Sequence, residues 1–185
     1  MSTTTIPTSS SVAASFSGDA DHSSFGFAVK HMSVSTFRGA FEDVTAAVEV
    51  DEHGAIGVAG SARVESISVR SPVDLRVHLL SRDFFDAAQS PEITFRSRPA
   101  VPAADGAIEL QGELTIRNVT RAVVARGTWT GPVEDPFGAT RAALELSTTI
   151  DRRDYGMTWN LPLPKGGDAL GNEVAITVHL ELVAS

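Results

Sequence analysis

The chain has 185 residues, of which 42% are hydrophobic and 21% charged, and its formal net charge is −8. This length suits a single domain with a core of ordinary size. The acidic balance and the lack of a lysine or arginine cluster argue against nucleic-acid binding, which depends on neutralising phosphates, and against a basic membrane anchor. The chain has no cysteine, so disulfides and thiolate metal sites are excluded.

The first residues have a composition unlike the rest of the chain. Residues 1–15 are rich in Ser and Thr and contain no Lys, no Arg and no apolar run. This composition predicts a disordered tail and lacks the charged start and apolar centre of a secretory signal. No stretch approaches the roughly 20 apolar residues of a membrane span. We therefore expect a cytoplasmic protein with no integral membrane segment and a single domain over residues 16–185.

Large apolar residues alternate with small or charged ones at the start of this domain. The alternating residues are Phe25, Phe27, Val29 and His31. A β-strand places such a series on one face. Phe37 and Phe41 then begin a second strand, 37–50, whose apolar phase shifts midway, as at a β-bulge. A third strand is expected over residues 56–69.

One helical segment is expected between the third and fourth strands, at about residues 72–88. Ser71 suits an N-cap, Pro72 suits the first helical position and Asp74 suits the first turn. The segment Gln89-Ser-Pro91 then ends the helix.

The second half of the chain reads as strands. Apolar and polar residues alternate most regularly over residues 108–116, and similar patterns continue to residue 182. About eight long strands with one apolar face favour an all-β fold, an eight-stranded antiparallel barrel, because closure leaves no unpaired sheet edge. A sandwich of two sheets is the alternative.

Seven short segments, in order from about residue 16 to the end, resemble the YceI-like, polyisoprenoid-binding family. They are His22-Ser23, Phe27-x-Val29-Lys-His31, Phe37-x-Gly39-x-Phe41, Leu80-Ser-Arg-Asp-Phe-Phe-Asp86, Pro91-Glu-Ile-Thr-Phe95-x-Ser97, Gly112-x-Leu-Thr-Ile116-x-x-Val-Thr120 and Arg153-x-Tyr-Gly156. The resemblance implies an extended, lipocalin-like barrel that holds a long prenyl chain in an internal tunnel, and it also predicts a homodimer. Tyr155 stands where the family usually has Phe.

The resemblance implies that the ligand contacts the lining of the barrel. The aromatic loop 152–160 is a candidate lid or entrance, and the alternatives are a loop packed on the barrel end or a dimer contact. The candidate ligand-binding residues are Phe25, Phe27, Val29, Phe37, Phe41, Phe84, Phe95, Leu114, Trp129, Leu144, Tyr155, Met157, Trp159 and Ile176. The alternative is that these side chains fill the interior, since small eight-stranded barrels can be packed solid. His22 and His31 are candidates for head-group contacts or structural hydrogen bonds.

The expected function is therefore binding, storage or transport of a long-chain isoprenoid lipid, such as a quinone or its precursor, without catalysis. An enzymatic alternative, a small barrel hydrolase or isomerase, would use His22 or His31 with Asp83. A third alternative is a filled barrel that acts only through partners. No two histidines have metal-ligand spacing, and the chain has no phosphate loop, dinucleotide fingerprint or Gly-x-Ser-x-Gly motif, so no metal and no cofactor are expected.

Overall fold

The computed structural model describes residues 12–185. Within this range the chain forms ten β-strands, one α-helix and two short 3-10 helices. The strands are β1 (Val12–Gly18), β2 (Ser24–His31), β3 (Ser35–Phe41), β4 (Val44–Asp51), β5 (Ile56–Arg63), β6 (Glu92–Ser97), β7 (Ala107–Ile116), β8 (Val119–Glu134), β9 (Thr140–Asp151) and β10 (Leu170–Ala184). The α-helix is α1 (Val73–Leu80), and the 3-10 helices are η1 (Val64–Ser66) and η2 (Arg152–Tyr155).

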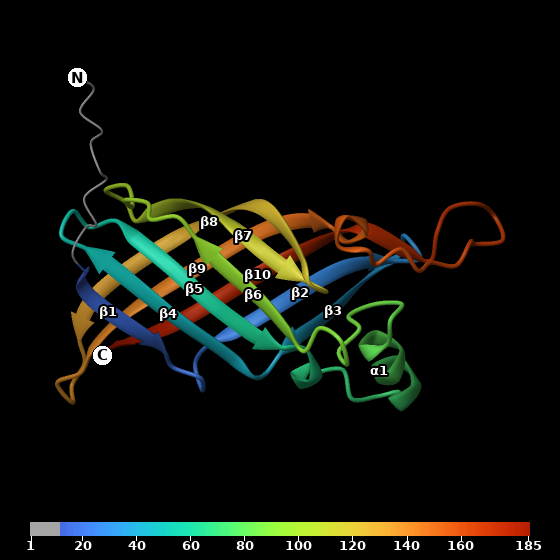
Figure 1. The fold of residues 1–185 in the computed structure, drawn as a ribbon, viewed down its shortest axis with the longest axis horizontal. Coiled ribbons are helices and arrows are strands. Elements are labelled where there is room, and N and C mark those ends of the chain that lie inside the picture. The colour runs from blue at the N-terminus through green and yellow to red at the C-terminus, as the bar shows by residue number, and fades with distance from the viewer. Residues whose placement is uncertain (1–11) are drawn as a thin grey trace, which may run out of the picture.

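The sheet closes because β10 pairs with two strands along one edge. β2 pairs with its first part, residues 170–179, and β1 pairs with its last part, residues 182–184. β3 pairs with β2, and β4 pairs with β1. Strands β1 and β2 therefore share one strand position of the barrel, and β3 and β4 share the next. The other strands follow in order from β5 to β10 (Figure 1). The closed eight-stranded antiparallel barrel predicted from the sequence is confirmed.

The predicted second strand is divided into two. β3 ends at Phe41 and β4 begins at Val44. Between them the backbone N–H of Glu42 leaves the sheet and donates to the carbonyl of Ser66 at 3.1 Å. The shift of apolar phase in the sequence therefore marks a break between two strands and not a bulge within one. The predicted third strand also ends early, at Arg63, where η1 begins.

The predicted N-terminal tail, residues 1–15, overlaps the first strand. Residues 1–11 lie outside the described residues, but β1 begins at Val12 and pairs with β4 and β10. Phe16 is 3% exposed and lies in the barrel core. Ala and Ser occupy most positions of this strand, so its alternation of apolar and polar residues is weak. The prediction of a disordered tail is therefore wrong for residues 12–15.

The helix is shorter than the predicted range of 72–88. It ends at Leu80, because Ser81 takes an extended backbone conformation, and Asp86 has a φ of 51°, which a helix does not allow. The turn over residues 81–90 brings the adjacent rings of Phe84 and Phe85 to the interior, where both are buried. Pro72, not Ser71, precedes the helix as its N-cap.

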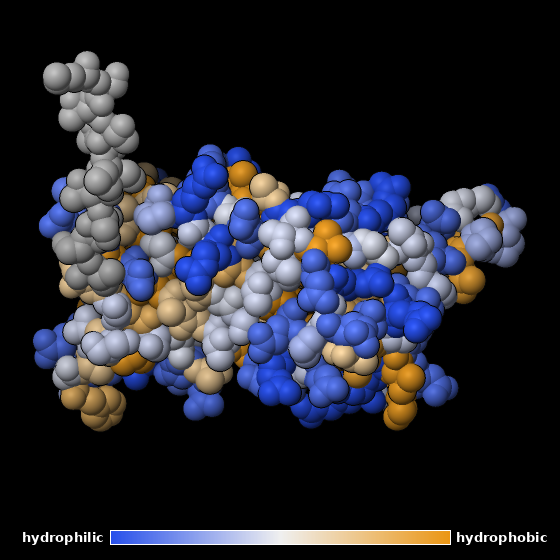
Figure 2. All heavy atoms as spheres, in the orientation of Figure 1, coloured by the Kyte–Doolittle hydropathy of each residue, from blue (hydrophilic) through white to orange (hydrophobic). Residues whose placement is uncertain are grey.

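The helix covers one end of the barrel and exposes part of its own apolar surface. α1 lies at the end opposite the C-terminus and the start of β1 (Figure 1). Leu79 is buried, whereas Val73 and Val77 are 67% and 62% exposed. Figure 2 shows apolar surface protruding at this position. None of the helices in residues 12–185 has the length and the apolar character that a membrane span requires.

The barrel interior contains two separate clusters of buried side chains. The cluster at the end with the termini is tightly enclosed, and several of its residues are 0–1% exposed: Val48, Ile56, Leu110, Leu144 and Leu182. The cluster at the helix end contains Phe25, Phe41, Phe84, Phe85 and their neighbours. The difference between these two halves determines where the candidate site lies.

Candidate functional site

A wall of phenylalanine side chains lines the barrel at the helix end. The period-two pattern of β2 and β3 places its rings on the same face, and the register pairs Phe25 with Phe41 and Phe27 with Gly39. The rings of Phe25 and Phe41 stack with their centroids 5.4 Å apart. The alternation predicted from the sequence therefore produces a continuous aromatic surface that faces inward.

Two glycines allow aromatic rings to lie flat against this wall. A Cβ atom at Gly39 would lie 2.6 Å from the ring of Phe27, and one at Gly112 would lie 2.7 Å from the ring of Phe95. Real Cβ atoms do not approach other atoms so closely. Each ring therefore covers bare backbone and does not extend into the middle of the barrel.

The space left inside the wall consists of two adjoining apolar cavities. The larger, here called the outer chamber, lies beneath α1 and the turn that follows it and has a volume of about 340 Å³. The smaller, here called the inner chamber, lies deeper in the barrel and has a volume of about 80 Å³. The two chambers share Phe25, Ile93 and Ile176, which form a waist between them. An elongated apolar molecule fits this shape better than a compact one.

The tightly packed cluster near the C-terminus and β1 closes the far end of the inner chamber. Beyond Leu180, which lines the chamber, Leu182 is completely buried. Phe16 and Trp129 meet edge to face there, with ring centroids 5.8 Å apart. The sequence left open whether the barrel interior is hollow or filled. The structure is hollow at the helix end and filled at the other end.

The mouth of the outer chamber is built from α1, the following turn and the loop after η2. His78 of α1 packs edge to face against Trp159 and Phe84, with centroid distances of 4.6 and 5.0 Å. His78 also bonds to Asp83, with Nε2 and Oδ2 3.1 Å apart. Leu161 lines the chamber and remains 54% exposed. The loop therefore forms one side of the opening.

A buried arginine lies in the wall of this apolar chamber. Arg152 follows β9 in the same alternation as Leu146 and Ile150, so its side chain faces the interior, and it is 2% exposed. Its guanidinium donates to the carbonyls of Met157, Trp159 and Gly171 and to Oδ1 of Asn172. Burial lowers the pKa of Arg152, but a guanidinium remains charged in proteins.

The structure places most of the predicted ligand-binding residues around the two chambers. Those that line a chamber are Phe25, Phe27, Val29, Phe37, Phe41, Phe84, Phe95, Leu114, Met157, Trp159 and Ile176. Trp129 and Leu144 belong instead to the packed cluster. Tyr155 is 1% exposed and lines a polar depression between β8 and β9, away from both chambers.

Sequence reasoning missed several residues of the lining. Phe85, Ile116, Ile150, Arg152 and Val174 all line the outer chamber. Four of them continue an alternation that the sequence displays, so extending the period-two pattern by one step would have found them. Phe85 has no such signal, because the turn that carries it was expected to be helical.

The two predicted histidines lie in different surroundings. His31 lines the outer chamber. His22 lies in the turn between β1 and β2 and its side chain is 61% exposed. Neither has a hydrogen bond to Asp83 among the described residues, because Asp83 pairs with His78. The structure therefore does not assemble the pair that the enzymatic alternative requires.

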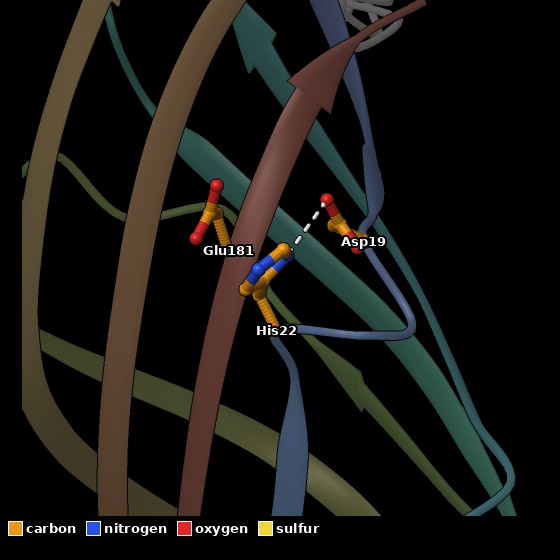
Figure 3. A group of neighbouring side chains, drawn as sticks. All are labelled: Asp19, His22 and Glu181. Carbon is orange, nitrogen blue, oxygen red and sulfur yellow. Dashed lines mark ion pairs between the residues drawn. The ribbon is translucent and has the colours of Figure 1, made fainter.

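His22 belongs to a small cluster with Asp19 and Glu181 (Figure 3). The hydrogen bond between Asp19 and His22 lowers the pKa of Asp19 and raises that of His22. Arg141 donates to Asp19 at 3.2 Å and to Glu181 at 2.6 Å. Arg141 also pairs with Asp135 at 2.8 Å, so its one positive charge is shared among three carboxylates. This group therefore reads as an ion-pair network that holds the turn against β10.

Solved structures share the fold at low sequence identity. BcnA of Burkholderia cenocepacia has a TM-score of 0.73 and 22% identity, over 89% of this chain and 98% of that chain. A domain of Saccharophagus degradans, described as polyisoprenoid binding and implicated in plant cell wall breakdown, has a TM-score of 0.67 and 13% identity, over 95% of this chain and 100% of that chain.

Sequence comparisons identify the family. UPF0312 protein SAB2563 of Staphylococcus aureus (strain bovine RF122 / ET3-1) is 30% identical over 172 residues, which cover 92% of this chain and 98% of that protein. The sequence pattern of the YceI-like domain matches residues 16–182. The chain therefore belongs to the YceI-like family.

Proposed function

We propose that this protein is a carrier that binds the long apolar tail of an isoprenoid lipid inside its barrel. The observation that carries the proposal is the pair of adjoining apolar chambers that share Phe25, Ile93 and Ile176 in their walls. The wall is made mostly of aliphatic and aromatic side chains, which bind a hydrocarbon without special chemistry. The fold shared with a domain described as polyisoprenoid binding supports a prenyl tail over other tails.

The energetics of burial favour such a ligand. Burying one CH₂ group contributes about 0.8 kcal/mol, and each isoprene unit has five carbons. Association and ordering oppose binding by about 4–15 kcal/mol. A few buried isoprene units are therefore enough for tight binding, even when the head group contributes little.

The test is to identify what the purified protein contains. Native mass spectrometry should detect a bound species, and organic extraction should release a prenyl lipid. Apolar burial should hold such a ligand through aqueous purification. Delipidated protein should then take up an added prenyl lipid. A protein that is isolated empty and ignores added prenyl lipids would contradict the proposal.

A further inference from the structure

The lining of the outer chamber contains a positive charge that no carboxylate neutralises directly. Arg152 is 2% exposed, and in the part of the chain that the structure describes it forms no ion pair. Its neighbour Asp151 is held by Arg153, whose Nη2 lies 2.6 Å from Oδ2. Asp151 and Asp168 act on Arg152 only through space. All hydrogen-bond acceptors of Arg152 are neutral amide oxygens.

A buried charge in an apolar cavity is costly, so its retention needs a reason. The four hydrogen bonds of Arg152 pin the mouth loop to β10, and this is one role. A neutral amide side chain carries two N–H donors, so it could keep two of these four bonds without the burial of a charge. The four bonds also use only four of the five N–H groups that a guanidinium carries. One donor of Arg152 therefore has no hydrogen-bond partner among residues 12–185, and no carboxylate pairs with its charge there.

The position of Arg152 suits the head of a lipid. The side chain lies at the mouth, level with Trp159 and Leu161, whereas the inner chamber lies at the opposite end of the hollow. A lipid that enters tail first leaves its head beside the mouth. His31, which also lines the outer chamber, is a second polar group at this level.

We infer that Arg152 selects lipids whose head is an anionic oxygen group, a phosphate or a carboxylate, over those with a neutral head. This inference rests on the proposed lipid-binding function and adds the chemical class of the head group. An anionic oxygen accepts from the remaining N–H of Arg152 and neutralises its charge, and charge-assisted hydrogen bonds are about twice as strong as neutral ones. A hydroxyl or a quinone carbonyl can accept the same bond, but it leaves the charge of Arg152 without a counter-charge.

The experiment compares three ligands with the same tail: farnesyl phosphate, farnesoic acid and farnesol. Binding is measured by calorimetry and by the change in tryptophan fluorescence, because one of the two tryptophans, Trp159, lies in the chamber wall. Both anionic ligands should bind the wild-type protein about tenfold more tightly than farnesol, or more, because a hydrogen bond to a charged group contributes about 1.5–3 kcal/mol. In Arg152→Gln the ratio should fall to about one.

Two control variants separate head-group selection from other effects. Arg153→Gln removes the same charge from the exposed neighbouring residue and should keep the wild-type ratio. Asn172→Ala removes one contact of Arg152 with β10 but keeps the charge of Arg152, so it should also keep the ratio. Equal binding of all three ligands to the wild-type protein would overturn the inference and leave the carrier function intact. If none of the three binds, the carrier function itself is wrong, and this inference with it.

Discussion

Gly39 and Gly112 set how far aromatic rings extend into the barrel. Substituting Gly39→Ala should tilt the ring of Phe27 into the outer chamber, because the new Cβ would lie 2.6 Å from it. We expect affinity for a prenyl ligand to fall about tenfold, which corresponds to the loss of room for about two CH₂ groups. The free energy of unfolding should fall by about 1–3 kcal/mol from overpacking.

The matched control for this prediction is Gly57→Ala in β5. A Cβ at Gly57 meets only Pro99, at an ordinary 3.7 Å. This variant should bind lipid as the wild type does, which calorimetric titration checks. Equal loss of affinity in both variants would show that the glycine opposite Phe27 does not shape the chamber.

Tyr155 buries a hydroxyl group that has no hydrogen-bond partner among residues 12–185. Leaving a buried polar group unpaired costs about 1–3 kcal/mol. We therefore expect Tyr155→Phe to raise the free energy of unfolding by about 1 kcal/mol, measured by urea denaturation. A clear loss of stability would mean that the hydroxyl is bonded in solution.

The same residue predicts a pH dependence. Burial raises the pKa of Tyr155 from 10.0 to about 12. Because the folded state holds this proton more tightly than the unfolded state, the contribution is fully present below pH 10 and is lost as the pH rises toward 12. Tyr155 is the single tyrosine of the chain, so the phenolate absorbance reports it alone. Half-ionisation of the folded protein near pH 10 would contradict the prediction.

At the scale of elements, Leu79 is the one buried side chain of α1. Leu79 is 7% exposed and lines the outer chamber, whereas Val77 is 62% exposed. Leu79→Ala should lower the free energy of unfolding by about 2–5 kcal/mol and speed amide exchange over residues 73–80. Val77→Ala is the control and should change the stability by less than about 0.5 kcal/mol. Similar exchange in both variants would show that Leu79 does not anchor the helix.

The elements also show what the sequence was able to predict. The strands were predicted well because one face of each is buried and period-two alternation records that directly. The predicted helix was too long because the residues after Leu80 form a turn. This turn brings the adjacent rings of Phe84 and Phe85 inward, and no local pattern in the sequence indicates it. β1 was missed because Ala and Ser carry little pattern.

The site was predicted less completely than the fold, for a physical reason. Alternation indicates which residues face the interior but not how much of the interior is filled. Leu144 and Leu114 have the same pattern, yet Leu144 lies in the packed cluster and Leu114 lines the inner chamber. That difference depends on the volumes of side chains from distant strands, which no local pattern contains.

At the scale of the whole molecule, the depth of the hollow limits the length of the tail. Along β10, the wall of the two chambers runs from Leu170 to Leu180. At about 3.3 Å per residue and a strand tilt of about 40°, this corresponds to roughly 25 Å along the barrel axis. Tails beyond this depth must leave part of their length outside.

We therefore expect affinity for prenyl alcohols to rise with each added isoprene unit and then to level off. Displacement of a fluorescent fatty probe by a series of increasing chain length measures this. Leu180→Ala, which enlarges the inner chamber, should move the plateau to a longer tail. Affinity that keeps rising through the longest members in the wild type would show that the packed cluster opens to admit the tail.

The packed cluster behind the inner chamber also bears on how cargo is exchanged. Because that end is filled, a tail that enters through the mouth of the outer chamber must leave through the same mouth. Loading and unloading are then successive events, and a donor and an acceptor cannot be served at once. The carrier that we propose must therefore leave its lipid donor before it meets its lipid acceptor, as a shuttle does and a conduit does not.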